Sequence, residues 1–257
     1  MSAAENESTI HRLSAELERL RLSASEGSDE AMQTLAQWLK KLGPKLAEVV
    51  PSTRFDVVLF DVGGVLLTNG WDHVERASVL DHFGITGADR DRLEARHSEP
   101  YDALERDQIT IDEFLQQAIF FEPRSFTPAE FLEAMKQQSQ PIPDNAQSVL
   151  AEVSASNRWI VGLLNNESRV LHEYRMEKFG IGQFVDVQFS SPYMALRKPE
   201  PAIYKRALDI LSIPGDRVIF IDDRATNTKA AAAAGMHAIQ FLGEAKLRHD
   251  LQQLGIL

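Results

Sequence analysis

The chain has no cysteine, which excludes disulfide bonds, a catalytic thiolate and cysteine-ligated zinc. It also lacks an apolar run long enough to span a bilayer, and its first residues, MSAAENE, resemble no secretory signal. Basic residues are in deficit, because 27 Lys and Arg stand against 38 Asp and Glu, giving a net charge of -11. That charge argues against nucleic acid or an anionic membrane as a partner. We therefore expect a cytoplasmic protein that binds neither.

One stretch, DVVLFDVGG at residues 56–64, organises the rest of the sequence. It is an apolar, β-branched run that ends in Asp61 and is followed by Gly63 and Gly64, and this pattern is typical of a buried strand. In parallel α/β sheets, ligands bind at the carboxyl edge, where such a strand would place its last residue. The pattern therefore predicts a reactive carboxylate at that edge.

Helical patterns fill residues 70–141, where Thr110 with Glu113 and Thr127 with Glu130 form the spacing of capping boxes. After them, strands alternate with helices. We expect strands near 159–164, 185–190, 218–222 and 237–241, and helices near 144–156, 167–179, 200–212, 225–234 and 243–253. This order predicts an α/β fold, a Rossmann-like parallel sheet with helices on both faces. Residues 51–69 and 142–257 would form the core, and residues 70–141 an all-α cap.

Residues 1–50 form a separate helical extension in this prediction. Apolar residues recur at helical spacing before and after a break at residues 23–28. Two interpretations stay open: a helical hairpin packed on the body of the protein, or an element that joins two copies into a homodimer.

Polar residues interrupt the apolar pattern at four strand ends or loops. They are Asp61, the pair Asn165-Asn166, the run Arg197-Lys198-Pro199 and the pair Asp222-Asp223. Carboxylates from two strands around one lysine suit a hard divalent cation beside a phosphoryl group.

These residues resemble the motifs of the haloacid dehalogenase (HAD) superfamily, in particular phosphatases with a helical cap after the first motif. The four matching runs, in chain order, are FDVGGVL at 60–66, LLNN at 163–166, LRKPEPAIY at 196–204 and FIDDRATN at 220–227. The resemblance covers residues 55–245 and implies the α/β fold expected above.

The resemblance also implies roles for the catalytic and metal-binding residues. Asp61 would be the nucleophile, forming an aspartyl-phosphate that water hydrolyses. Asp61, Asp223 and the carbonyl of Gly63 would hold Mg²⁺, with Asp222 bound through water or supporting the other ligands. Lys198 would bridge Asp61 and the phosphate.

Phosphate oxygens would be bound by Asn165 and the neighbouring amides, including those of Asn166 and Gly64. Asn165 stands where the family usually has Ser or Thr, and its amide can still donate a hydrogen bond.

A second departure concerns the proton. The family's phosphatases usually carry another aspartate two residues after the nucleophile, as general acid and base, but this chain has Gly63 there. The loss should cost on the order of 10²–10⁴ in rate for a poor leaving group and less for a good one, as in a sugar 1-phosphate. Asp72 and His73 are candidates to supply the proton. We expect His73, His82 and His97 to lie at the surface.

The residues thus favour a Mg²⁺-dependent phosphatase acting on a small phosphorylated metabolite. The alternative is a catalytically impaired relative that binds a phosphorylated ligand or a protein partner, which Gly63 and Asn165 favour. A 2-haloacid dehalogenase would use Asp61 without a metal, so the pair Asp222-Asp223 argues against that activity.

Overall fold

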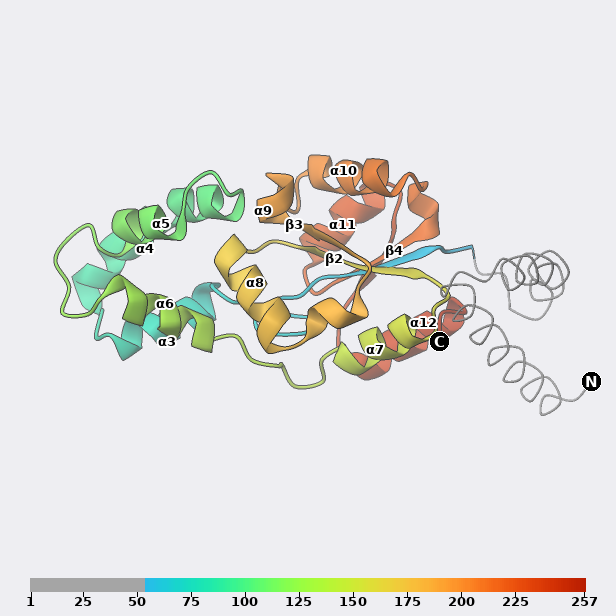
Figure 1. The fold of residues 1–257 in the computed structure, drawn as a ribbon, viewed down its shortest axis with the longest axis horizontal. Coiled ribbons are helices and arrows are strands. Elements are labelled where there is room, and N and C mark those ends of the chain that lie inside the picture. Colours follow the sequence, from blue (N-terminus) through green and yellow to red (C-terminus); the bar gives the residue numbers. More distant parts are fainter. Residues whose placement is uncertain (1–53) are drawn as a thin grey trace, which may run out of the picture. The chain divides into compact units, whose positions relative to one another are not determined.

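The computed structural model describes residues 54–257, so the predicted extension at residues 1–50, and with it the predicted dimer contact, lies outside the described residues. The five strands form one parallel sheet in the order β3-β2-β1-β4-β5. Their bounds are Val57–Phe60 (β1), Ile160–Asn165 (β2), Val187–Ser190 (β3), Val218–Asp222 (β4) and His237–Gln240 (β5). The predicted fold class is confirmed (Figure 1).

Strand β1 is apolar throughout because both of its faces are covered. Side chains alternate across a strand, so Val58 and Phe60 enter one core and Val57 and Leu59 the other. The first core also holds residues of the helices Gln147–Ala155 (α7) and Glu244–Gln253 (α12), and Arg169–Lys178 (α8) packs against it. The second holds residues of Pro201–Leu211 (α10) and Ala225–Ala233 (α11), which lie on the opposite side of the sheet in Figure 1. Short helices at Ile181–Phe184 (η1), Ser191–Met194 (α9) and Gly215–Arg217 (η2) complete this part.

Between β1 and α7 the described chain is helical. We call this segment the helical insert; its helices are His73–His82 (α3), Gly87–Glu105 (α4), Ile111–Ala118 (α5) and Pro128–Gln137 (α6). Both predicted capping boxes are present, at Thr110 with Glu113 and at Thr127 with Glu130. The insert has an apolar cluster of its own, which Leu171 of α8 joins. Through Leu171, the apolar cluster of the insert packs against α8, one of the helices that cover the sheet.

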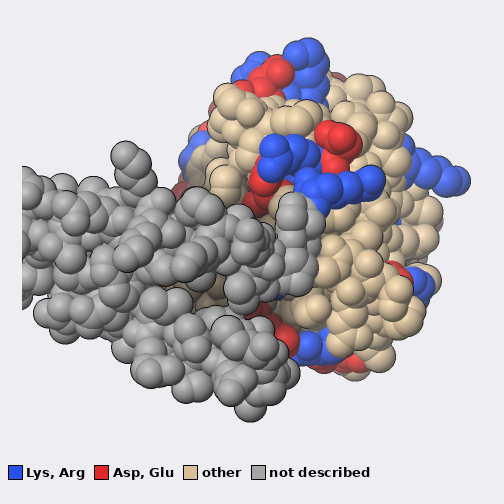
Figure 2. Space-filling model, turned by 90° about the vertical axis from the view of Figure 1, so that its right-hand side faces the viewer, with Lys and Arg blue, Asp and Glu red and all other residues tan. Residues whose placement is uncertain are grey.

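Charges on the described surface are largely paired. Arg217 lies 2.5 Å from Asp56, and Arg248 lies 2.6 Å from Glu152. Figure 2 shows acidic and basic side chains side by side on the described part of one face. Among the described helices, none has both the length and the apolar character needed to cross a membrane.

Candidate active site

The parallel register brings the predicted polar residues to one edge of the sheet. Phe60 of β1 is level with Leu163 of β2 and with Ile221 of β4, so the residues that follow these three emerge together. The backbone N–H of Asp61 donates to Ile221 O at 2.8 Å and extends the pairing by one residue. Asp61 and Asp222 consequently lie side by side at the carboxyl ends of two central strands.

Lys198 lies between these two carboxylates. Its Nζ is 2.9 Å from Asp61 Oδ2 and 2.6 Å from Asp222 Oδ2, and all three side chains are buried. The loop that carries Lys198 is held by the side chain of Asn166, which donates to Lys198 O and accepts from Lys198 N, both at 2.8 Å. Asn166 therefore positions the lysine, because its amide is engaged on both sides.

Burial and neighbouring charges act in opposite directions on these groups. Burial raises the pKa of Asp61 well above its usual value despite the lowering effect of Lys198, and Asp222 raises it further. Burial alone would lower the pKa of Lys198, but the carboxylates of Asp222 and Asp61 raise it overall. Burial would raise the pKa of Asp222, yet Lys198 holds it below its usual range. The lysine is therefore charged, and the cluster has more carboxylates than cations.

Three carboxylates of this cluster could hold a metal ion. One oxygen from each of Asp61, Asp222 and Asp223 lies within 4.8 Å of the others. Asp223 Oδ1 is buried and has no hydrogen-bond partner among the described residues, and burial together with Asp222 raises the pKa of this side chain. The two oxygens of Asp222, in contrast, already accept hydrogen bonds from Arg224 N, Asn227 Nδ2 and Lys198 Nζ. Of the two carboxylates, Asp223 is thus the one with an oxygen still free to bind a cation.

The backbone at Gly64 passes close to the side chain of Asp223. Its φ is +71°, and a Cβ atom there would lie 3.0 Å from Asp223 Oδ1 and closer still to Oδ2. At Gly63 a Cβ atom would meet Asn69 Oδ1 at 2.9 Å. Gly64 lets the backbone pass close to the acidic cluster, and Gly63 lets it pass close to Asn69. The metal ligands that the three carboxylates offer are oxygens, which suits a hard cation such as Mg²⁺.

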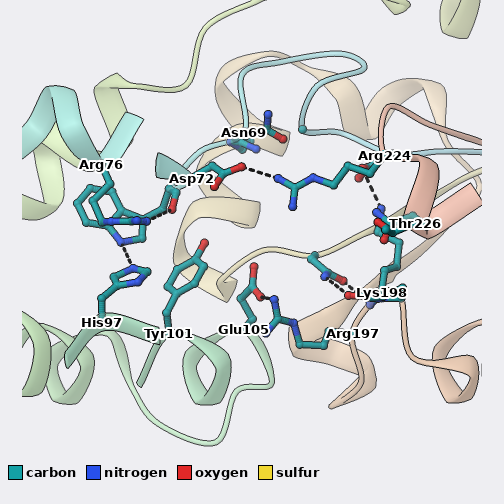
Figure 3. Close-up of a pocket in the computed structure, with 17 residues that line it drawn as sticks. Asn69, Asp72, Arg76, His97, Tyr101, Glu105, Arg197, Lys198, Arg224 and Thr226 are labelled. Atoms are coloured by element: carbon teal, nitrogen blue, oxygen red, sulfur yellow. Dashed lines mark hydrogen bonds and ion pairs between the residues drawn. The ribbon is translucent and has the colours of Figure 1, made fainter. Parts of the chain in front are cut away.

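A cavity of about 270 Å³ opens above this cluster (Figure 3). Four of the predicted site residues line it: Asp61, Gly63, Asn166 and Lys198. The lining also contains residues from the helical insert and the loop before it, from α8, and from the start of α11, which the sequence did not indicate as site residues. They are Asn69, Arg76, His97, Glu105, Arg175, Arg224, Thr226 and Asn227.

Asn165, Gly64, Asp222 and Asp223 are not part of the cavity lining. Asn165 is buried, with its Nδ2 3.4 Å from His172 Nδ1 and its Oδ1 without a hydrogen-bond partner. Its role toward phosphate stays a prediction.

The two candidate proton donors differ in position. Asp72 lines the cavity, but it accepts hydrogen bonds from His73 N at 2.7 Å and from Arg224 Nη2 at 2.6 Å. Burial would raise its pKa, yet the backbone of His73 and the charge of Arg224 keep the pKa below the usual value. The His73 side chain is 76% exposed and lies outside the lining. Asp72 is therefore held as a carboxylate, and His73 lies outside the cavity in which a proton would be needed.

The prediction of a surface position is wrong for His97. This side chain is buried, lines the cavity and accepts a hydrogen bond at Nε2 from Trp71 Nε1 at 2.8 Å. Burial lowers its pKa to about 4, so it is neutral and can act as that acceptor. A signal was present, because Leu93, His97, Tyr101 and Leu104 follow the spacing of one helix face.

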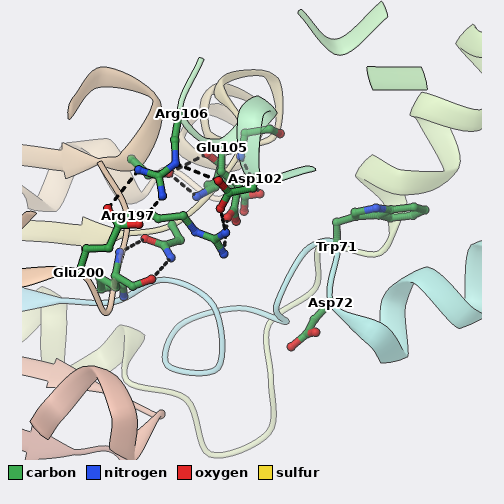
Figure 4. A network of polar contacts seen from close by, with 12 residues as sticks. Trp71, Asp72, Asp102, Glu105, Arg106, Arg197 and Glu200 are labelled. Carbon is green, nitrogen blue, oxygen red and sulfur yellow. Dashed lines mark hydrogen bonds and ion pairs between the residues drawn. The ribbon is translucent and has the colours of Figure 1, made fainter. Parts of the chain in front are cut away.

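A network of charges joins the end of α4 to the Lys198 loop (Figure 4). Arg197 pairs with Asp102 and, at 2.9 Å, with Glu105 Oε2, while Arg106 pairs with Glu200. The network joins the helical insert to Arg197 and Glu200, which lie on either side of Lys198 in the chain.

Comparison with known proteins agrees with this geometry. The sequence model of a family described as haloacid dehalogenase-like hydrolase matches residues 55–235. A flavin mononucleotide hydrolase of Arabidopsis thaliana is 26% identical over 209 residues, covering 81% of each chain. A sesquiterpene phosphatase of Aspergillus oryzae is 25% identical over 205 residues, covering 79% of this chain and 97% of that protein.

Among solved structures, a HAD family enzyme from Bacteroides thetaiotaomicron, in complex with magnesium and inorganic phosphate, shares the fold. It aligns with a TM-score of 0.62 at 20% identity, covering 72% of this chain and 93% of that one.

Proposed function

This chain belongs to the haloacid dehalogenase-like hydrolase family, and from that premise we propose that it is a Mg²⁺-dependent phosphatase of a small phosphorylated metabolite. Asp61 is the nucleophile, and the reaction passes through an aspartyl-phosphate on its side chain. The two relatives named above are, by name, a mononucleotide hydrolase and a phosphatase, which supports phosphate-ester hydrolysis as the activity.

One observation carries the proposal: Lys198 lies within ion-pair distance of Asp61 and Asp222, while Asp223 has a buried oxygen without a partner. A phosphoryl group brings further negative charge, so an acidic cluster can accept it only with added positive charge. Lys198 supplies part of that charge and orients the attacking oxygen of Asp61. The unsatisfied Asp223 marks the place where a cation would supply the rest.

The donors fit Mg²⁺. Asp61, Asp223 and the carbonyl of Gly63 would hold the ion, and Asp222, whose oxygens already accept four hydrogen bonds, would orient Lys198, Asn227 and the backbone of Arg224. When bound, the ion would neutralise the carboxylates and polarise the phosphoryl oxygens. Lys198 remains charged and restrains Asp61 in the attacking position.

The cavity favours a small substrate. Its volume of about 270 Å³ is below the range usual for sites that bury drug-sized ligands, roughly 300–1,000 Å³. Most of its lining is polar or charged, with Trp71 and Tyr101 providing aromatic surface on the side of the insert. A sugar phosphate matches this combination, and the helical insert is proposed as the element that selects it.

A second candidate function is binding without turnover, and the observation that favours it is Gly63, where no side chain can donate a proton. A 2-haloacid dehalogenase is disfavoured, because that reaction has no use for a third carboxylate with an unsatisfied oxygen.

Hydrolysis of p-nitrophenyl phosphate with and without Mg²⁺ separates these functions, since its leaving group needs little help from an acid. We expect Mg²⁺-dependent turnover that Asp61→Asn abolishes. Asp56→Asn is the matched control, because Asp56 precedes the same strand at its other end and pairs with Arg217. Turnover equal to that of Asp61→Asn would instead support the binding function.

A further inference from the structure

The proposed phosphatase lacks a proton donor where its family usually has one. Gly63 has no side chain, and the nearby Asp72 is held ionised by His73 N and Arg224. A poor leaving group, such as an alkoxide, departs slowly unless an acid protonates it. The cavity must therefore supply this acid from elsewhere, or the enzyme must restrict itself to substrates with good leaving groups.

We propose that Glu105, the last residue of α4, is the general acid and base of this site; the inference rests on the proposed phosphatase function. Glu105 lines the same cavity as Asp61 and Lys198, and it reaches the cavity from the helical insert rather than from the strand ends. Figure 3 shows its carboxyl group directed into the cavity, between Tyr101 and Arg197. Because Asp61 and Glu105 line one cavity, a leaving group on a phosphoryl group attached to Asp61 would share that space with Glu105.

The hydrogen bonding of Glu105 differs from that of Asp72. Its side chain is only 7% exposed. The buried Oε2 lies 2.9 Å from Arg197 Nη2 and forms an ion pair with it, whereas no hydrogen bond or ion pair among the described residues involves Oε1. Asp72 accepts well-formed bonds from His73 N and Arg224 and is fixed as a carboxylate. Glu105 thus keeps an oxygen available for a proton and for a substrate oxygen.

Burial and the surrounding charges give Glu105 a pKa near neutral pH, so both its protonated and its ionised form are populated there. Burial raises its pKa to about 7; Arg197 opposes this shift, and Glu167 and Asp102 add to it. Arg224, across the cavity, lowers the pKa slightly, and Tyr101 on the same helix faces the same space. An acid and base that works in both halves of a reaction needs a pKa of this kind.

The chemistry balances with Glu105 in both steps. In the first, Asp61 Oδ attacks phosphorus, the bond to the leaving oxygen breaks, and the Glu105 proton passes to that oxygen, which leaves as an alcohol. In the second, the Glu105 carboxylate takes a proton from water, the water oxygen attacks phosphorus, and the bond to Asp61 breaks. Inorganic phosphate departs, Asp61 is a carboxylate again and Glu105 is protonated.

If Glu105 had only a structural role, it would act through its ion pair with Arg197. Asp102 provides a control for that possibility. Asp102 is the other carboxylate paired with Arg197, on the same helix, and it does not line the cavity. Asp102→Asn disturbs Arg197 without removing the carboxyl group in the cavity, whereas Glu105→Gln removes that group with almost no change in volume.

The experiment compares phenyl phosphate with p-nitrophenyl phosphate, which are similar in shape but differ in how well the alcohol leaves. For Glu105→Gln we expect kcat/KM to fall on the order of 10²–10⁴ for phenyl phosphate and less than about tenfold for p-nitrophenyl phosphate. The alkaline limb of the wild-type kcat/KM profile, near pH 7, should disappear. An initial burst of nitrophenolate should also appear, because hydrolysis of the aspartyl-phosphate loses its base.

Asp102→Asn should keep the wild-type ratio of the two substrates and the absence of a burst. Its pH limb should persist but move to lower pH, because the charge of Asp102 raises the pKa of Glu105. The proposal is overturned if Glu105→Gln slows both substrates equally, or if Asp102→Asn reproduces its effects. A wild-type enzyme with no Asp61-dependent turnover of p-nitrophenyl phosphate would overturn the phosphatase itself, so the two failures are distinct.

Discussion

Replacing Gly64 with alanine should weaken both the fold and Mg²⁺ binding, whereas a matched glycine replacement elsewhere should weaken the fold alone. At φ +71° an alanine costs about 1–2 kcal/mol in backbone strain. Its Cβ atom would also overlap the carboxyl group of Asp223, and the nearest atoms all belong to that side chain. Asp223 can relieve the overlap by rotating away, at a further cost of about 1 kcal/mol. The rotation moves its oxygens by roughly an ångström, which is large against Mg²⁺–oxygen distances of about 2.1 Å.

Gly84→Ala provides the matched control. Gly84 has φ +68°, almost the same backbone conformation, but apart from Gly84 itself and its two chain neighbours no atom of residues 54–257 lies within 4 Å of the position of its Cβ atom. In urea, Gly84→Ala should lose about 1–2 kcal/mol of unfolding free energy from the backbone conformation alone, and Gly64→Ala about 2–3 kcal/mol because Asp223 must also rotate.

Only Gly64→Ala should need more Mg²⁺ for half-maximal p-nitrophenyl phosphate hydrolysis, by about 10–100-fold. An unchanged Mg²⁺ requirement in Gly64→Ala would refute the inference that Asp223 holds the ion beside this glycine.

Two further predictions concern the helical insert. The folded-state pKa of His97, about 4, lies below the ordinary 6.5, so the unfolded chain binds more protons between these values and stability falls as the pH drops through them. Urea unfolding should show a loss of up to about 3 kcal/mol from this group, absent in His97→Gln; an equal loss in that variant would contradict the burial argument. Thr110→Ala should lose about 1 kcal/mol of unfolding free energy, because Thr110 accepts from Glu113 N. Thr86→Ala, at a helix start without such a bond, should lose only a few tenths, and equal losses would argue against the capping box.

The strand-end cluster could be predicted from sequence because its geometry follows from local patterns. An apolar run fixes a strand, alternation with helices fixes a parallel sheet, and parallel strands present their last residues at one edge. Asp61 and Asp222 needed nothing more to be placed together. The bounds of β4 were predicted as 218–222 and are Val218–Asp222, since the apolar run ends abruptly at the pair Asp222-Asp223.

The other wall of the cavity could not be predicted in this way. Which residues of the insert face Asp61 depends on how the apolar cluster of the insert packs with Leu171 of α8 and on the ion pairs of Arg197. Both contacts join residues that are far apart in the chain, and no spacing rule encodes them. Glu105 therefore looked like one more charge at the end of a helix.

Asn165 shows a similar limit within the sheet. The pattern places it at the last position of β2, but whether its side chain faces the cavity depends on the alternation of the strand and on its contact with His172.

The central claim is that Asp61 carries the phosphoryl group, and trapping it tests this most directly. Wild-type enzyme turning over p-nitrophenyl phosphate with a radiolabelled phosphate, in the presence of Mg²⁺, is quenched rapidly in acid. We predict covalent label that survives acid, is released by hydroxylamine as an acyl phosphate should be, and maps to Asp61 after peptide analysis. Asp61→Asn should carry none. Label on a different residue, or equal label on Asp61→Asn, would contradict the account.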